Sequence, residues 1–438
     1  MKYSYKVKET DNFSNVKDVL KSYFFVSSRL ITKLKNAHYI FLNDSNASLS
    51  DAVENGDIVS FFVDFDEDSS NIVPVKMDLD IVYEDDSFLI VNKPAFMAVH
   101  PTAYHFSDTL SNGVKFYFDS IGLHKKIRIV NRLDRNTSGL VIIAKNEYVQ
   151  EFLIRQMKSF SINEAAISKN VSNANLISDD RSSKNLIDMS VSNKTICSDD
   201  KILKNIESTD KSKLNISNCF EKKYLGIVQG DFSNLKEISH KKESGIYYLH
   251  ISKIDDSDVF IKSLCDKNEV VAGTIDLPIA RKNGSIIERC VSHDGEKAIT
   301  NFRIIREFNV SLDTKDFGIL DSNDINKNKN ILSAYLINKN LEKDYSNANY
   351  MNNESTFSLV EFSLETGRTH QIRVHTSYFG HPLLGDDLYG GDTTLINRQA
   401  LHCYFVKFIH PQTREFVSFT APLPEDFKKV LSYFEIKE

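Results

Sequence analysis

Short blocks of apolar residues separated by polar turns run through most of the chain, a pattern that predicts many short strands and a few amphipathic helices. Ile81–Pro94 predicts two strands around an acidic turn. Ile127–Val130 and Leu140–Lys145 predict two more strands, and Asn146 is placed to cap a helix. The apolar side of that helix carries Val149, Phe152, Leu153 and Met157. Residues 131–139 are therefore expected to form a loop between two buried strands.

The first 70 residues predict a separate small α+β domain. Apolar residues recur at helical spacing between Val16 and Phe24, and a second helix is expected after Ser27 or Ser28 as its N-cap. Tyr39–Leu42 and a run that starts at Ile58 then predict a small sheet. Arg29 and Lys33 lie four residues apart on the second helix. They form either an exposed helix face without a ligand or a contact with RNA.

An acidic run, Asp64–Asn71, predicts a solvated linker and a domain boundary near residue 70. The second domain is then expected over residues 71–438. Two stretches inside it, at about 159–220 and 309–356, are rich in Ser, Asn, Asp and Lys and lack periodicity. We interpret both as low-complexity insertions that leave the core through surface loops.

Charge is unevenly distributed along the 438 residues. The formal net charge is −6, which is not typical of a nucleic-acid-binding protein. Between His124 and Lys145, however, there are six basic residues against the single acid Asp134: Lys125, Lys126, Arg128, Arg132, Arg135 and Lys145. This local excess favours contact with an anion such as RNA, although a solvated basic face with no ligand gives the same pattern.

Other features of the composition exclude several classes of site. The five cysteines are far apart and lack metal-ligand spacing, so neither a disulfide framework nor a zinc site is indicated. No apolar run is long enough to cross a bilayer, and the start of the chain lacks a signal-peptide core. We expect a cytoplasmic protein that binds no membrane and no metal.

The loop Asn131–Gly139 carries the clearest candidate for chemistry. It places one carboxylate, Asp134, between Arg132 and Arg135 on a turn that ends in glycine. A carboxylate flanked by cations is expected to stay ionised and is well placed to act as a nucleophile or a base. A structural ion pair that stabilises the turn is the alternative interpretation of these residues alone.

A second candidate segment runs from Gly367 to His375. Thr369 is expected to cap a short helix that stops at Gly380, which places Arg373 in its first turns. Taken alone, Arg373 could pair with Glu361 or Glu365 at a surface. The histidines of this segment have poor spacing for a metal site, and no acid completes a set of ligands.

Together and in this order, these segments closely resemble the RluA-type family of RNA pseudouridine synthases. The resemblance rests on Val91–Pro94, Asn131–Gly139, Lys223–Gly230, Gly273–Ile279 and Gly367–Gly390, and covers most of residues 75–435 outside the insertions. Residues 1–70 resemble the small RNA-binding domain named after a small-subunit ribosomal protein of the S-four type. The resemblance implies an α+β fold, with a central mixed, mainly antiparallel sheet flanked by helices.

The resemblance also implies a reaction and its residues. Uracil is detached from its ribose at N1, turned and rejoined through C5, with no external cofactor. Asp134 matches the catalytic aspartate, and Arg373 matches the arginine that holds this aspartate charged and oriented. Tyr224 matches the tyrosine that packs against uracil and is a candidate to remove the C5 proton. Arg132 matches the arginine associated with extrusion of the target nucleotide.

RNA contacts and the target are expected from the same resemblance. Lys125, Lys126, Arg128 and Arg135, together with Arg29 and Lys33, are candidates to contact phosphates. One departure is Asn131, where many family members have His, and we expect altered loop or RNA contacts without loss of chemistry.

We expect a monomeric pseudouridine synthase that acts on ribosomal RNA of the large subunit, with tRNA as the nearest variant. An inactive RNA-binding or ribosome-assembly factor is the alternative from another class. A glycosidase fits poorly, because that reaction needs two carboxylates across a sugar.

Overall fold

A computed structural model describes residues 1–65, 67, 71–102, 105–157, 219–232, 239–243, 246–251, 270–311 and 354–437. The first insertion expected from the sequence lies almost wholly outside these residues. The second, expected at 309–356, begins and ends inside paired strands, because one strand extends to Ser311 and the next begins at Glu354. The rest of it lies outside the described residues.

Residues 1–62 form a small sheet covered by helices. Its strands run in the order β1-β4-β2-β3. The elements are β1 (Lys2–Lys6), α1 (Val16–Asp18) continued by a π-helical turn (Val19–Tyr23), α2 (Ser28–Asn36), β2 (Ile40–Leu42), β3 (Ser45–Asn46) and β4 (Ile58–Phe62). Ser27 caps α2, since its hydroxyl accepts a hydrogen bond from the Leu30 amide. The helices and strands expected here are confirmed, whereas the first strand, β1, was not foreseen.

The remaining described residues form a second unit around a twelve-stranded mixed sheet. The central path is β10-β11-β12-β15-β16-β9-β17-β8-β6-β5, with β18 beside β17 and β7 beside β8. Its strands are β5 (Ile81–Glu84), β6 (Phe88–Lys93), β7 (Arg128–Ile129), β8 (Ser138–Ala144), β9 (Glu221–Gln229), β10 (Ser239–Glu243), β11 (Ile246–Ile251), β12 (Val270–Asp276), β15 (Ile299–Ser311), β16 (Glu354–Leu364), β17 (Leu401–Ile409) and β18 (Phe416–Thr420). Only the β11–β12 and β8–β17 pairs are parallel. The mixed, mainly antiparallel sheet expected from the sequence is confirmed.

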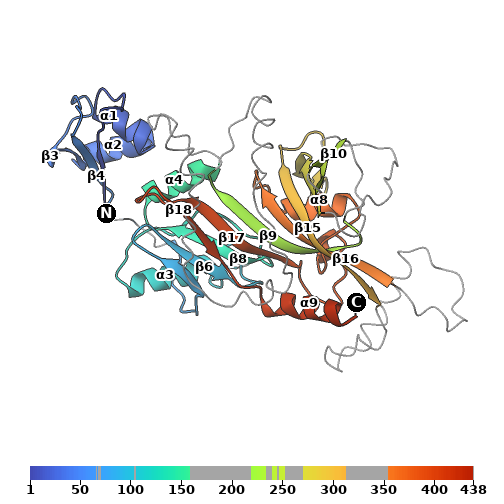
Figure 1. Ribbon diagram of the computed structural model, residues 1–438. Coiled ribbons are helices and arrows are strands. Elements are labelled where there is room, and N and C mark those ends of the chain that lie inside the picture. Colours follow the sequence, from blue (N-terminus) through green and yellow to red (C-terminus); the bar gives the residue numbers. More distant parts are fainter. Residues whose placement is uncertain are drawn as a thin grey trace, which may run out of the picture.

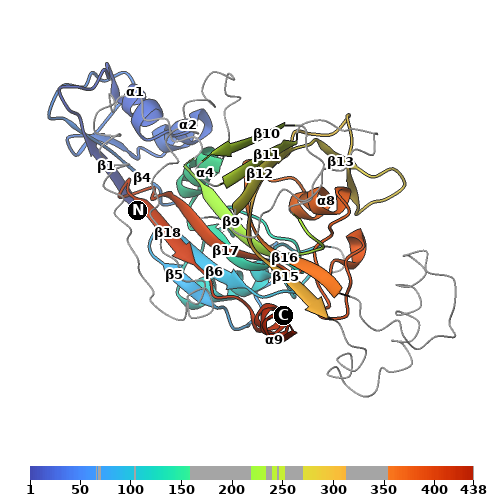
Figure 2. The same cartoon turned by 45° about the vertical axis from the view of Figure 1, so that its right-hand side comes forward.

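Helices lie along this sheet, as Figure 1 shows. They are α3 (Leu110–Ser120), α4 (Glu147–Met157), α8 (Gln371–Tyr378), a short 3-10 helix (Asp387–Tyr389) and α9 (Glu425–Lys437). A separate hairpin, β13 (Ile279–Arg281) with β14 (Arg289–Val291), lies close to α8 (Figure 2). Among the described residues, no helix is long and apolar enough to cross a bilayer.

At the centre of the sheet, β17 lies between β8, which follows the Asp134 loop, and β9, which carries Tyr224. Gly139 at the start of β8 has a φ of 118°, and a Cβ there would lie 2.2 Å from the Cys403 carbonyl oxygen of β17. Only glycine permits this approach. Because β9 pairs with the other edge of β17, the Asp134 loop that precedes β8 comes next to Tyr224 on β9.

The small N-terminal unit packs directly on α4 of the second unit. Tyr3 and Tyr148 form an edge-to-face pair with ring centroids 4.4 Å apart, and the Tyr148 hydroxyl donates to the Phe24 carbonyl. Arg414 lies 4.4 Å above the ring of Phe152 and donates to the Tyr148 hydroxyl. Ser27 donates to Glu151 at 2.9 Å. The two units therefore share one continuous hydrophobic core.

The linker between the units is less solvated than its acidic composition suggested. Glu67 forms a two-pronged ion pair with Arg128, and both side chains are about nine-tenths buried. Asp64 accepts from Lys125 at 3.0 Å. The expectation of a solvated linker is wrong at Glu67, because opposite charges of the linker and of the segment before β7 neutralise each other.

Candidate active site

The Asp134 loop is held in place from three sides. The ammonium group of Lys93, at the end of β6, donates to the carbonyl oxygens of Pro94, Met97 and Arg135 at 2.8, 2.9 and 3.2 Å. Arg398 donates to the Asn136 carbonyl, and Gln399 donates to the Thr137 hydroxyl. Burial lowers the pKa of Lys93 to about 7, although the charge of Asp134 opposes that shift. These contacts fix the position of Asp134 without binding its carboxylate.

Asn131, at the start of the loop, has a structural role. Its side chain is buried, its amide nitrogen donates to the Leu140 carbonyl, and its amide oxygen accepts from the Ile142 amide, both at 2.9 Å. The side chain therefore joins the loop to β8 and does not face outward. The effect expected from Asn131 in place of His, on loop or RNA contacts, stays a prediction.

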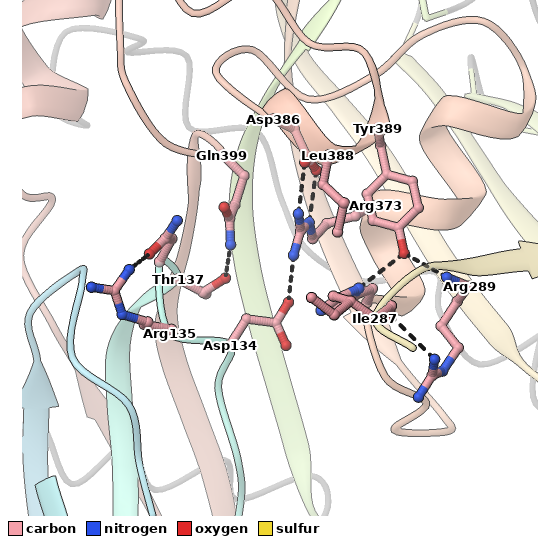
Figure 3. A network of polar contacts seen from close by, with 12 residues as sticks. Asp134, Arg135, Thr137, Ile287, Arg289, Arg373, Asp386, Leu388, Tyr389 and Gln399 are labelled. Atoms are coloured by element: carbon pink, nitrogen blue, oxygen red, sulfur yellow. Dashed lines mark hydrogen bonds and ion pairs between the residues drawn. The ribbon is translucent and has the colours of Figure 1, made fainter. Parts of the chain in front are cut away.

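Arg373 of α8 lies between two carboxylates (Figure 3). Its Nε and Nη2 atoms donate to the two oxygens of Asp386, each at 2.7 Å, and its Nη1 atom lies 3.4 Å from Asp134 Oδ2. Asp386 is fully buried, whereas Asp134 keeps about a quarter of its side chain exposed. The bidentate pair with Asp386 thus orients Arg373, and the remaining nitrogen faces Asp134.

Burial alone would lower the pKa of Arg373, but hydrogen bonds to Asp386 and the charges of Asp386 and Asp134 raise it. The guanidinium also lies 5.0 Å from the centre of the Tyr389 ring. Sequence reasoning left Glu361 and Glu365 open as surface partners of Arg373, and the partners are Asp386 and Asp134 instead.

The helix that carries Arg373 begins one residue later than expected. His370, not Thr369, precedes the first helical residue, and it has a left-handed φ of 57° with no side-chain cap. Its ring bonds to the Tyr389 hydroxyl at 2.9 Å, which in turn accepts from the Arg289 amide. A tertiary contact therefore replaces the expected threonine cap. The predicted stop at Gly380 is confirmed by its φ of 78°.

Tyr224 lies on β9, opposite Cys403 of β17. Burial, and then the Cys403 thiol and the Asp134 carboxylate, raise the pKa of Tyr224 well above that of an ordinary tyrosine. Its hydroxyl is consequently a neutral phenol at pH 7. The side chain offers an apolar face and a hydroxyl to a ligand, but not a phenolate.

A cavity of about 240 Å³ joins these groups. Its walls include Asp134, Tyr224 and Arg373 together with Arg132, and they also include Lys222, Met157 and Leu401. Asp134 and Arg373 are 239 residues apart in the sequence, yet the fold brings both of them and Tyr224 to one cavity. One carboxylate, one phenol, several basic groups and apolar walls suit a flat, polar ring with an attached sugar.

The basic residues expected to contact RNA fall into two groups. Arg132, Arg135, Lys126 and Arg29 are exposed. Arg128 and Lys125 instead pair with Glu67 and Asp64 of the linker, and Lys33 bonds to Glu147 at 2.8 Å. Lys33 also lies 3.8 Å above the Phe65 ring.

The histidines of the segment support the fold of the site. His375 bonds to the Thr300 hydroxyl and to the Leu277 carbonyl, and burial lowers its pKa to about 4. Burial likewise lowers the pKa of His370. Across the described ranges, no cluster of three or more His, Cys, Asp or Glu side chains could hold a metal ion.

Sequence reasoning missed several residues that build this site. Asp386, Lys93, Arg398, Gln399, Tyr389 and Lys222 contact the candidate residues or line their cavity. Asp386 and Tyr389 lie in the Gly367–Gly390 segment on which the resemblance rests, and two others also carried a signal in sequence. Lys93 directly precedes Pro94 in a strand end that the resemblance had already singled out, and Lys222 lies two residues before Tyr224, on the same face of a strand.

The family model for RNA pseudouridylate synthases matches residues 87–165 and 209–378. These ranges cover more than half of the chain and contain Asp134, Tyr224 and Arg373. The chain therefore belongs to the RNA pseudouridylate synthase family, whose members are isomerases that act on RNA.

Individual relatives agree with this family. The chain is 29% identical to the uncharacterized RNA pseudouridine synthase YlyB of Bacillus subtilis, over 90% of this chain and 84% of that protein. It is 27% identical to the ribosomal large subunit pseudouridine synthase D of Neisseria meningitidis serogroup B, over 94% of this chain and 75% of that protein. Among solved structures, the human RNA pseudouridylate synthase domain containing 1 matches 79% of this chain and 84% of its own, at 17% identity and a TM-score of 0.38.

Proposed function

We propose that this protein converts uridine to pseudouridine in large-subunit ribosomal RNA, with Asp134 as its catalytic carboxylate. The observation that carries the proposal is the cavity in which Asp134, Tyr224 and Arg373 meet. Asp134 is the accessible member of the carboxylate pair around Arg373, and the buried Asp386 is fully used in orienting that arginine.

One carboxylate is enough for this isomerisation. Asp134 either attacks the sugar at C1′ or removes a proton from the sugar, and both routes release the base from C1′. Arg373 holds the carboxylate in place through Nη1, at 3.4 Å. We assign Tyr224 the role of packing against the uracil, because a neutral phenol is a weak acceptor for the C5 proton.

RNA must deliver an unstacked uridine to this cavity, since a stacked base hides its glycosidic bond. Arg132 is exposed and lines the cavity, which suits the role of handling the extruded nucleotide. Arg135, Lys126 and Arg29 are exposed and suit phosphate contacts. Lys125, Arg128 and Lys33 are paired with acids, so we expect a smaller contribution from these three.

The choice of ribosomal RNA rests on relatives named as ribosomal large subunit pseudouridine synthases and on the N-terminal unit. We propose that residues 1–70 are an RNA-binding domain of the S-four type and that residues 71–438 are the catalytic domain. Two helices against a small sheet, with exposed Arg29 on α2, support this assignment. A monomeric, cytoplasmic enzyme is part of the same proposal, and tRNA remains the alternative target.

The competing function, an RNA-binding or assembly factor without turnover, fits the cavity less well. Such a factor would gain nothing from a partly exposed carboxylate beside Arg132, where Asp134 would repel phosphate. A bidentate pair that orients an arginine toward that carboxylate is likewise unnecessary for binding alone.

The test uses RNA labelled with tritium at uridine C5, taken from cells that lack this protein. The wild type is expected to release tritium, and Asp134→Asn is expected to release none while it binds RNA as tightly as the wild type. Asp387→Asn, which removes an exposed carboxylate outside the cavity, is the matched control and should remain active. Undiminished release by Asp134→Asn would contradict the role of Asp134, and an inactive wild type would favour the binding factor.

A further inference from the structure

Lys222 lies in the wall of the cavity, yet neither the motifs nor the reaction described above use it. It is two residues before Tyr224 on β9, so both side chains point to the same face of the strand. Asp134, Tyr224 and Lys222 all line the same cavity.

Among the residues that the structure describes, no acidic side chain pairs with the ammonium group of Lys222. The residue is about nine-tenths buried, and within the described part of the chain its ammonium forms no hydrogen bond and no ion pair. After burial, the group that most affects the pKa of the Lys222 ammonium is the Cys403 thiol. Burial raises the pKa of that thiol to about 12, so the thiol is neutral. Lys93 is fully buried, but its ammonium donates to three carbonyl oxygens.

A largely buried ammonium with no acidic partner is unfavourable, because burial removes much of its water and no carboxylate compensates for that loss. Burial accordingly lowers the pKa of Lys222. An anionic or strongly polar ligand in the cavity would supply the missing acceptor. A residue kept at a cost to stability on the wall of an active site is a candidate for ligand binding.

We propose that the Lys222 ammonium binds a carbonyl oxygen of the target uracil and stabilises the negative charge that the base gains when it leaves the ribose. The inference rests on the proposed function and adds a substrate-binding residue to it.

The charge arises from the electron balance of the step. When the bond between C1′ and N1 breaks, its electron pair stays on the uracil and spreads over N1, O2 and O4. The new bond forms between C1′ and C5, and the C5 proton leaves afterwards. The lysine gives up no proton, so it acts as a fixed positive charge of the kind that stabilises developing oxyanions.

The base is a better ligand for Lys222 than a backbone phosphate. Lys222 shares its strand face with Tyr224, the residue expected to pack on the uracil, and it is buried on a cavity wall that also includes the apolar Met157 and Leu401. The exposed Arg132 and Arg135 are better placed for the phosphates, which stay near water.

The experiment compares Lys222→Met with Lys223→Met. Lys223 is the next residue on β9, so its side chain lies on the opposite face, and it is paired with Glu221 and Glu361. We expect Lys222→Met to lower the single-turnover rate of tritium release by about a hundredfold or more, while the dissociation constant for RNA stays within about twofold. Lys223→Met should keep the wild-type rate. The melting temperature of Lys222→Met should be equal or higher, because an unpaired buried charge is removed.

A modified substrate tests whether Lys222 binds the uracil or only supports the structure. An RNA oligonucleotide that carries the modified site is made with 2-thiouridine or 4-thiouridine at the target, since sulfur is a weaker acceptor than oxygen. One of the two should slow the wild type, and the same replacement should have little effect on Lys222→Met or Lys222→Gln, which no longer offer the charge. The Gln variant repeats the test if the Met variant does not fold.

Three results would overturn the inference. The first is a wild-type rate of tritium release in Lys222→Met. The second is a Lys222 variant that loses RNA affinity but keeps its rate at saturating RNA, which would point to a phosphate as the ligand. The third is an equal effect of the thiouridine replacement on the rates of the wild type and the variants. An inactive wild type would instead contradict the proposed function, on which the inference depends.

Discussion

At the scale of single residues, the site depends on how Arg373 divides its hydrogen bonds. Asp386 takes two of its nitrogens at 2.7 Å, and Asp134 faces a third at 3.4 Å. The shorter, buried pair fixes the guanidinium plane, and the longer contact leaves Asp134 free to meet a substrate. A residue of the protein core, Asp386, therefore sets the geometry of the residue proposed to do chemistry.

The variant Asp386→Asn tests this arrangement. An amide keeps only one acceptor oxygen for Arg373, so the guanidinium should turn away from Asp134, and misplacement of about 1 Å can cost about a hundredfold in rate. We expect the single-turnover rate to fall by roughly ten- to a hundredfold, with RNA affinity unchanged. The exposed neighbour Asp387→Asn serves as the control. Wild-type kinetics in Asp386→Asn would show that Arg373 needs no second carboxylate.

Sequence alone indicates the catalytic candidates but not the residues that support them. Asp134, Tyr224 and Arg373 stand in motifs with a fixed order, and the fold places them at one cavity. Asp386 also stood in a matching segment, but nothing in its neighbourhood said which arginine it would bind. Such pairings depend on tertiary contacts that no local pattern encodes.

At the scale of elements, α8 is the part that joins the site to the sheet. His375 is fully buried on α8 and bonds to Thr300 of β15 and to the Leu277 carbonyl. The start of α8 is set by the contact between His370 and Tyr389, and not by a threonine cap. For this reason the sequence predicted the end of the helix at Gly380 but placed its start wrongly.

Two other helices, α3 and α9, were not foreseen. The apolar residues of α9 (Phe427, Val430, Leu431 and Phe434) do recur at helical spacing, and they form part of a second hydrophobic cluster. The β5–β6 hairpin and the Asn146-capped α4 were predicted, because turn residues and caps signal these elements locally.

The neutral, buried state of His375 predicts a pH dependence of stability. Its pKa in the folded protein is about 4, below that of an exposed histidine, so the unfolded state binds more protons between pH 6.5 and 4. The free energy of unfolding should therefore fall as the pH falls through this window, by up to about 1.4 kcal/mol per pH unit for each such histidine. His402, with a pKa lowered to about 4 by burial, contributes in the same direction.

Urea unfolding at several pH values measures this slope. His375→Gln should flatten it, whereas the same substitution at the exposed His124 should leave it unchanged. A slope that stays the same in His375→Gln would mean that His375 is not buried in neutral form.

At the scale of the whole molecule, the N-terminal unit and the second unit share one hydrophobic core. Tyr3, Tyr148 and Arg414 join their cores, and Glu67 of the linker is bound to Arg128. The division near residue 70 stays a prediction from the sequence. The sequence could not show that the linker neutralises part of the basic segment, because the pair of Glu67 and Arg128 spans 61 residues.

This pairing divides the basic residues by role. Arg132→Gln should weaken RNA binding and reduce the slope of log affinity against log salt by about one, as expected for a lost contact with RNA phosphate. Arg128→Gln should barely change that slope, but it leaves Glu67 buried without its partner and should lower the free energy of unfolding by about 3 kcal/mol. RNA titrations at several salt concentrations, with urea unfolding of the same variants, check both. Equal salt slopes for wild type and Arg132→Gln would remove Arg132 from the RNA surface.

The central claim is that Asp134 in this cavity makes pseudouridine in ribosomal RNA. The most direct measurement is pseudouridine mapping of ribosomal and transfer RNA in cells that lack the protein and are then supplied with wild type or Asp134→Asn. We expect at least one pseudouridine of the large-subunit RNA to disappear, to return with the wild type and to stay absent with Asp134→Asn. Return of that pseudouridine with Asp134→Asn, or an unchanged map in cells without the protein, would contradict the account.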